Sequence, residues 1–193
     1  MDKRTLVRKR LKYPLFHHYG NLSSTALQTL SKNFISTPES LHNAKSLRDA
    51  HLTSEYNDYN DDQILGYNQY DIQTKDPESD EVDESYHLIK ENFIEVRDEL
   101  SVLLDSPICR LRYATIEIDD SFMYHVDPPG KDRFVMVIEG SQDFYIEDKA
   151  GEHIQPMKLG EVWYVNSNWP HKIENTGSTT RVALLGSYDF KKP

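Results

Sequence analysis

The spacing of apolar residues divides the chain into a polar N-terminal part and a β-rich C-terminal part. From residue 108 onward, short runs rich in Val, Ile, Tyr and Phe alternate with Gly, Pro and Asn turn residues, which is typical of strands. The runs are residues 111–118, 133–138, 144–146, 162–165, 171–174 and 182–185. Because no helical pattern separates them, these strands must pair antiparallel, and the sequence predicts a sandwich or jelly roll.

Two amphipathic helices are predicted ahead of these strands. The first begins at Ser23 or Ser24, either of which suits an N-cap, and the second carries an apolar stripe that should lie against a sheet. The first stripe consists of Leu22, Ala26, Leu27, Leu30 and Phe34, and the second of Tyr86, Ile89, Phe93, Val96, Leu100 and Leu103.

The remainder of the N-terminal part is polar. Residues 55–71 contain many Asn and Asp without a clear period, and this composition predicts turns and loop. The acidic run 76–84 indicates a solvated linker or the charged approach to a helix. We therefore expect a partly helical N-terminal extension over residues 1–84, followed by a helix and the β core over residues 85–193.

Composition limits the partners and the compartment. The 193 residues include 22 Lys and Arg against 32 Asp and Glu, a net charge of −10, which fits one domain and argues against nucleic acid as a partner, because the overall field repels phosphate. No apolar run approaches about 18 residues, so no membrane span is expected. The single cysteine, Cys109, excludes an internal disulfide, and no secretory signal pattern opens the chain; both favour a cytoplasmic location.

Three polar residues in the β part have the chemistry of a metal site. His125 and Asp127 leave one strand two residues apart, so both side chains point to the same side. His171 begins another strand 46 residues later and can supply a second imidazole. Two His and one carboxylate with open positions form the ligand set of non-haem Fe(II) oxygenases. His153 is a rival ligand, but it follows a turn directly and is expected on a hairpin surface.

Two arginines at strand starts are candidates for binding a carboxylate. The planar, permanently charged guanidinium group suits paired hydrogen bonds to a carboxylate. Arg181 follows His171 by ten residues, which suggests a dicarboxylate co-substrate held at its far end. Arg133, eight residues after His125, is the second candidate. The alternative for each is an ion pair with a surface acid of this acidic protein.

Three segments together resemble the C-terminal signature of the aspartyl/asparaginyl β-hydroxylase family. They are GEVWYVN at residues 160–166, WPHKIEN at residues 169–175 and RVALL at residues 181–185. The upstream pattern around His125 and Asp127 also looks like the metal-binding strand of that family. The resemblance covers roughly residues 110–189, and it implies a double-stranded β-helix, which is a cupin-like jelly roll, with the activity of an Fe(II)- and 2-oxoglutarate-dependent dioxygenase.

The resemblance also implies roles for individual residues. His125, Asp127 and His171 would be the iron ligands of the catalytic centre, and Arg181 and Arg133 would contact 2-oxoglutarate. Asn175 would support the co-substrate site indirectly, by fixing the strand that carries His171. The implied oxidoreductase consumes O2 and 2-oxoglutarate, hydroxylates an amino acid, free or within a peptide, and releases succinate and CO2.

Several residues remain candidates for contact with the substrate, and two other classes of protein remain open. Arg110, Arg112 and Tyr113 could contact an amino-acid substrate, and Trp163, Tyr164 and Trp169 could wall the pocket, although Trp163 is more simply a core residue. Residues 160–175 also resemble the second cupin motif. A cupin-type metal-binding protein and a non-oxygenase small-molecule binding module are therefore the alternatives.

Overall fold

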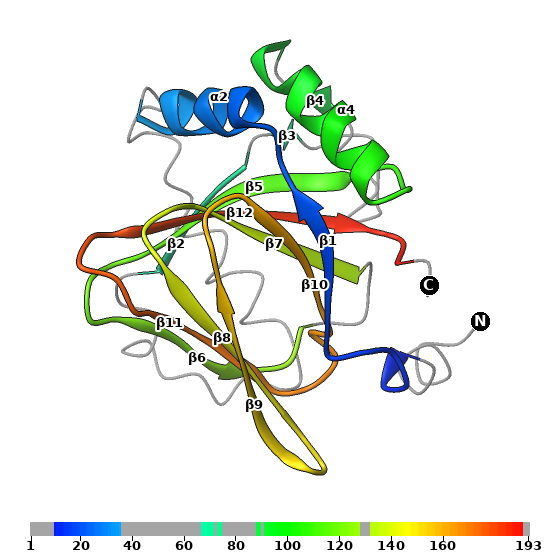
Figure 1. Cartoon of the computed structure of the whole chain (residues 1–193), viewed down its shortest axis with the longest axis vertical. Coiled ribbons are helices and arrows are strands. Elements are labelled where there is room, and N and C mark those ends of the chain that lie inside the picture. Colours follow the sequence, from blue (N-terminus) through cyan, green and yellow to red (C-terminus); the bar gives the residue numbers. More distant parts are fainter. Residues whose placement is uncertain are drawn as a thin grey trace.

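The computed structural model of the protein describes residues 10–35, 67–71, 73–74, 88–89, 91–127 and 132–190. Ten strands form two antiparallel sheets that face each other (Figure 1). They are β1 (Phe16–Asn21), β2 (Tyr67–Asp71), β5 (Cys109–Ile116), β6 (Ser121–His125), β7 (Asp132–Glu139), β8 (Gln142–Asp148), β9 (Gly151–Met157), β10 (Glu161–Val165), β11 (His171–Asn175) and β12 (Arg181–Tyr188). The larger sheet has the order β1-β10-β7-β12-β5-β2, and the smaller sheet has the order β6-β11-β8-β9.

The strand order from β5 to β12 defines the fold. The chain changes sheets at most connections, so that β5, β7, β10 and β12 lie in the larger sheet and β6, β8, β9 and β11 in the smaller one. This interleaving of two Greek keys around one interior is the topology of a jelly roll, or double-stranded β-helix. The predicted fold class, a mainly β protein of the cupin-like jelly-roll type with a helical N-terminal region, is confirmed.

Alternation along the strands separates an inner core from an outer core. On β7, Val135 and Val137 point between the sheets, whereas Phe134 and Met136 point to the other face of the larger sheet, as the two-residue period of a strand requires. The inner core also contains Ala114, Ile116, Phe122, Phe144, Ile146, Met157, Val165, Ile173, Ala183 and Leu185. A candidate site in the barrel interior is therefore enclosed by apolar side chains from both sheets.

Two helices cover the outer face of the larger sheet (Figure 1). They are α2 (Ser24–Ile35) and α4 (Ile94–Leu103), and a 3-10 turn, η3 (Glu91–Phe93), leads into α4. The predicted cap of α2 is confirmed, because the Ser23 hydroxyl accepts a hydrogen bond from the Ala26 amide at 3.2 Å. The predicted stripe of α2 is also confirmed: Leu22, Ala26 and Leu30 are buried in the outer core, and Leu27 and Phe34 are partly buried against it.

Part of the N-terminal region belongs to the same folded body as the barrel. The backbone of β1 pairs with β10 at the edge of the larger sheet, and α2 packs on the outer core beside α4. The domain boundary that we expect at residue 84 lies outside the described residues, as do residues 55–66 and 76–84. Among the described ranges, no helix is long and apolar enough to cross a membrane.

Two of the predicted element assignments are wrong in part. Residues 67–71 were expected in a loop but form β2, because their backbone pairs with β5. The second helix was expected to include Ile89, but Leu88–Ile89 forms the short strand β4, which pairs with β3 (Gln73–Thr74). Only the later part of its stripe is helical, with Phe93, Val96 and Leu100 buried. In both places, strand pairing prevails over the local pattern.

Candidate metal centre

Pairing between β6 and β11 brings the three predicted ligands together. His125 is the last residue of β6 and His171 the first of β11, and these two residues are direct partners in the antiparallel ladder. Asp127 follows two residues after His125. One possible ligand atom from each of the three side chains lies within 4.8 Å of those of the other two. The two histidines, 46 positions apart in the sequence, are thus brought together by one strand pair.

Each imidazole is oriented by the backbone of its own segment. Nδ1 of His125 lies 2.8 Å from the Met123 carbonyl oxygen, and Nδ1 of His171 lies 2.9 Å from that of Trp169. Because a carbonyl oxygen only accepts, each Nδ1 must carry the proton and donate. The lone pair is then on Nε2 of both rings, which is the arrangement found in metal-binding histidines.

The carboxylate of Asp127 lies between the imidazoles and an arginine. Its Oδ1 is 3.8 Å from Nε2 of His125, and its Oδ2 is 3.4 Å from Nε of Arg133. Burial alone would raise the pKa of Asp127, but Arg133, His171 and His125 together hold that pKa well below its usual value. Asp127 is therefore ionised, with one oxygen toward Arg133 and the other toward the histidines.

The protonation state of His171 also suits a metal ion. Burial, more than any other cause, lowers the pKa of His171, although Asp127 and the Trp169 carbonyl act in the opposite direction. A neutral imidazole and an ionised carboxylate are the forms that bind a metal ion. The donor set, the tautomers and the charge states of the cluster therefore fit a divalent cation.

The larger sheet places the predicted Arg133 and Arg181 on its inner face. Arg133, near the start of β7, donates from Nη1 to the Ser187 hydroxyl besides lying against Asp127. Arg181 is fully buried at the start of β12. It donates from Nη1 to the Ala114 carbonyl at 3.3 Å and from Nη2 to the Gln142 side-chain carbonyl. Arg133 thus lies at the ligand cluster, while Arg181 bridges the two sheets.

Asn175 connects the turns at the end of β11 that is remote from His171. Its amide donates to the carbonyl oxygens of Ile116 at 3.1 Å and Thr179 at 2.8 Å. Its side-chain oxygen accepts from the Gly177 amide at 2.9 Å. These contacts with backbone groups join the end of β11 to the end of β5 and to the turn that precedes β12, so Asn175 lies at the opposite end of β11 from His171.

Some residues proposed for the pocket wall lie elsewhere. Tyr113 points into the outer core and donates to the Leu30 carbonyl at 2.8 Å, so it faces away from the barrel interior. Tyr164 is also in the outer core, where its ring stacks on Phe190. Both assignments to the pocket were wrong, because the sequence does not show which face of a doubly covered strand is inward.

The expected core position of Trp163 and surface position of His153 are confirmed. Trp163 and Trp169 pack against the inner core, and Nε1 of Trp169 is a buried donor without a hydrogen-bond partner among the described residues. Arg112 is buried and shares the inward face of β5 with Ala114. The rival ligand His153 lies on β9, with Nε2 2.9 Å from Asp148 Oδ1, and its half-exposed ring is outside the cluster.

Two polar neighbours of the arginines were not predicted from the sequence. Gln142 holds Arg181, and Ser187 holds Arg133. The sequence of a single strand does not show whether a Gln or Ser side chain points inward or to the surface. The distinguishing feature is burial, because Gln142 is 1% exposed and Ser187 is 0% exposed. Burial is known only once the strands are assembled. The described fold and its cluster define a double-stranded β-helix protein with a His-Asp-His group that could hold a metal ion.

Comparison with known proteins finds likeness in structure. No family model matches the chain, and no curated protein matches it. An oxidoreductase of the 2OG-Fe(II) oxygenase family from Burkholderia pseudomallei aligns at 13% identity over 65% of this chain and 69% of that chain, with a TM-score of 0.48. A cupin 2 domain-containing protein from Halorhodospira halophila aligns at 19% identity over 44% and 54%, with a TM-score of 0.34. Bacillus subtilis oxalate decarboxylase aligns at 17% identity over 74% of this chain but only 29% of its own length, with a TM-score of 0.42.

Proposed function

We propose that the protein is an Fe(II)- and 2-oxoglutarate-dependent dioxygenase that hydroxylates an amino acid, free or within a peptide. The observation that carries this proposal is the convergence of His125, Asp127 and His171 within 4.8 Å. Two imidazoles and one carboxylate on one side of an ion leave positions for other ligands, as in non-haem Fe(II) oxygenases. A structural zinc site would be closed by four protein ligands, commonly including Cys.

The iron would be held by Nε2 of the two histidines and by one oxygen of Asp127. Bound iron would supply the oxidising chemistry that couples the conversion of 2-oxoglutarate and O2 into succinate and CO2 to the insertion of one oxygen atom into a substrate C–H bond. The protein's own contribution is orientation. Arg133 holds Oδ2 of Asp127, so that Oδ1 is the oxygen left for the ion.

Arg181 is the proposed partner of the far carboxylate of 2-oxoglutarate. The backbone of Arg181 is paired with Ile116, next to the β5–β6 turn. Its guanidinium reaches the carbonyl of Ala114, two residues further from that turn. The side chain therefore extends toward the end of the barrel that carries the ligand cluster. Between His171 and Asn175, β11 spans about 13 Å at 3.3 Å per residue. The stem of Arg181 and an extended five-carbon diacid together suit that separation, and the buried fork suits a carboxylate.

The amino-acid substrate would meet the opposite part of the inner face. Arg112 lies four residues before the end of β5, and His125 lies four residues after the start of β6. Because one turn joins these strands, the two residues lie at a similar depth in the barrel. We therefore expect Arg112 to lie near the ligand cluster, whereas Arg181 pairs with Ile116 beside the β5–β6 turn. We propose Arg112 as a contact for the substrate and Arg181 as the contact for the co-substrate.

The test is succinate formation from 2-oxoglutarate by protein loaded with Fe(II) under anaerobic conditions and then exposed to O2. A panel of amino acids and short peptides should include one that raises succinate formation and appears as a product 16 mass units heavier. The variants His171→Ala and Asp127→Ala should form no succinate. Absence of both coupled and uncoupled turnover in the iron-loaded wild type would contradict the proposal and favour a cupin-type metal-binding protein or a binding module.

A further inference from the structure

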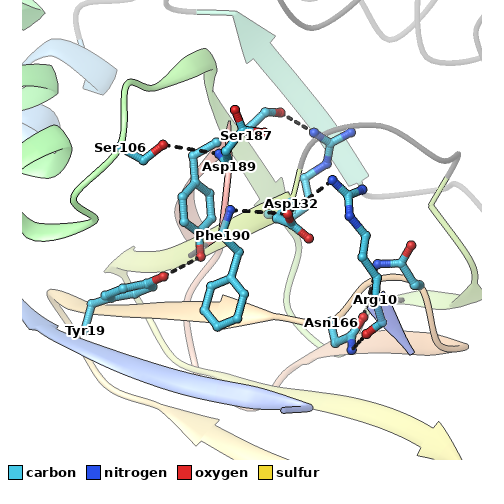
Figure 2. A network of polar contacts seen from close by, with 11 residues as sticks. Arg10, Tyr19, Ser106, Asp132, Asn166, Ser187, Asp189 and Phe190 are labelled. Atoms are coloured by element: carbon cyan, nitrogen blue, oxygen red, sulfur yellow. Dashed lines mark hydrogen bonds and ion pairs between the residues drawn. The ribbon is translucent and has the colours of Figure 1, made fainter. Parts of the chain in front are cut away.

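A short N-terminal segment, residues 10–15, lies against the start of β7 and against the loop that precedes β11. The buried side chain of Arg10 places Nη2 at 3.2 Å from Oδ2 of Asp132 (Figure 2). Asp132 is the first residue of β7 and directly precedes Arg133, which contacts Asp127. The same Asp132 oxygen accepts from the Phe190 amide at 3.3 Å. The segment is thus joined to the start of β7 by a buried ion pair.

Asn166 joins the same segment to the loop that precedes β11. It is fully buried at the start of residues 166–170, and its Nδ2 donates to the Arg10 carbonyl at 2.9 Å (Figure 2) and to the Tyr13 carbonyl at 3.4 Å. Its backbone amide donates to the Leu15 carbonyl at 2.9 Å. Its side-chain oxygen accepts from Asn168 at 3.1 Å. Both ends of the Asn166 amide group are therefore used to shape this junction.

The loop in turn contacts two of the three ligands. The Ser167 carbonyl accepts from the Asp127 amide at 3.1 Å, and the Trp169 carbonyl accepts from Nδ1 of His171. The Trp169 amide is bonded to the Asn166 carbonyl at 3.2 Å. A continuous series of hydrogen bonds therefore runs from residues 10–15 through Asn166 to Asp127 and His171.

The Arg10–Asp132 ion pair contributes little to the stability of the fold, because both of its charged groups are buried. Burial raises the pKa of Asp132 even with Arg10 beside it, so the desolvation of that carboxylate is not fully offset. Buried pairs of this kind are poor stabilisers compared with apolar packing, and their best-attested use is to fix one arrangement of the chain. In this protein, the Arg10–Asp132 pair fixes the position of residues 10–15 against β7 and against residues 166–170, the loop that precedes β11.

We propose that residues 10–15 act as an N-terminal clamp on the metal centre, with Arg10 and Asn166 as positioning residues for Asp127 and His171. The proposal rests on the metal site of the proposed function. Partners that orient metal ligands typically change metal affinity by about 10- to 100-fold when they are removed. The clamp would act through the carbonyls of Ser167 and Trp169 and through Arg133, without touching the ion.

The first experiment measures Co(II) affinity by calorimetry on the full chain. Asn166→Ala should weaken Co(II) binding by about 10- to 100-fold. The control is Ser23→Ala, which removes the cap of α2 and its hydrogen bond to Glu99 and so lowers stability away from the clamp; its Co(II) affinity should equal that of the wild type. Wild-type affinity in Asn166→Ala, or an equal loss in Ser23→Ala, would overturn the proposal.

A second readout does not need a metal. Asn166→Ala should speed hydrogen exchange at the amides of Asp127 and Trp169, which are bonded to the loop, while exchange in the β5–β12 pairing stays unchanged. Faster exchange throughout the sheets would show a general loss of stability and overturn the positioning role. A wild type that binds no Co(II) would overturn the proposed function and the clamp together, whereas wild-type affinity in the variant overturns the clamp alone.

If Asn166→Ala does not fold, variants of the Arg10–Asp132 ion pair provide the test. The double variant Arg10→Met/Asp132→Asn removes both charges while keeping the shapes, and Asn at 132 can still accept from the Phe190 amide. It should weaken Co(II) binding in the same direction as Asn166→Ala. Arg10→Lys, which keeps the positive charge, should retain at least part of the Co(II) affinity that the double variant loses. Unchanged Co(II) affinity and unchanged hydrogen exchange in Arg10→Met/Asp132→Asn would contradict the role of the ion pair.

Discussion

Replacement of Arg181 should separate co-substrate binding from metal binding. Arg181→Met removes a fully buried guanidinium that donates to the Ala114 carbonyl and the Gln142 side chain. Removal of one partner of a buried, hydrogen-bonded charge pair costs about 2–5 kcal/mol. At 1.4 kcal/mol for each factor of ten, the affinity for 2-oxoglutarate should fall by about 30- to 4,000-fold.

The metal should remain bound in the same variant. Arg181 begins β12, just after the turn that follows Asn175, so four strand steps of β11, about 13 Å, separate that turn from His171. The contacts that orient the two imidazoles and Asp127 come from Met123, Trp169 and Arg133, and none of them involves Arg181. We therefore expect a Co(II) affinity close to that of the wild type.

The assay is calorimetric titration of 2-oxoglutarate into anaerobic, Fe(II)-loaded protein, with Co(II) affinity measured in parallel. Arg181→Lys, which keeps the charge but loses the planar fork, should bind 2-oxoglutarate with intermediate affinity. Thr180→Val is the matched control, because it removes only an exposed hydrogen bond to Glu117 at the neighbouring position. Unchanged 2-oxoglutarate affinity in Arg181→Met, or loss of the metal with the fold intact, would refute the assigned role.

Three further variants test the site and the fold. Asp127→Ala should weaken Co(II) binding by more than about 100-fold, the upper end for residues that only orient a ligand, and should abolish hydroxylation; retained activity would remove Asp127 from the ligand set. Tyr113→Phe should lower the free energy of unfolding by about 1–2 kcal/mol, because the buried Leu30 carbonyl loses its donor, yet leave turnover unchanged, and a loss of turnover at wild-type stability would return Tyr113 to the site. Gly186→Ala should cost about 1–3 kcal/mol in denaturant unfolding, because its Cβ would overlap the Phe134 ring; an unchanged midpoint would show that the ring moves aside.

The strands and the ligands could be predicted because both are local features of the sequence. Runs of Val, Ile, Tyr and Phe between turn residues predict the core strands of the barrel, and Ser23 with its following apolar stripe predicts α2. The positions His125 and Asp127, two residues apart at a strand end, need only the two-residue period of a strand to share a side. His171 at the start of another strand then completes a recognisable donor set.

Other features depend on contacts between distant segments and have no local pattern. The sequence of β1, FHHYGN, lacks the usual β-branched residues, and its strand form comes from pairing with β10. Trp163 and Tyr164 are adjacent on β10 and so point to opposite faces of the larger sheet. Both faces are covered, so the sequence does not show that Trp163 is the residue at the inner core. Likewise, the contact of Arg133 with Asp127 requires β7 and the end of β6 to meet in space.

The most direct test of the central claim is a crystal structure of the protein grown anaerobically with Fe(II) and 2-oxoglutarate, with diffraction data collected at the iron absorption edge. The account predicts one anomalous peak in contact with Nε2 of His125, Nε2 of His171 and an oxygen of Asp127, and a 2-oxoglutarate molecule whose far carboxylate meets Arg181. No iron at these three side chains, or 2-oxoglutarate bound away from Arg181, would contradict it.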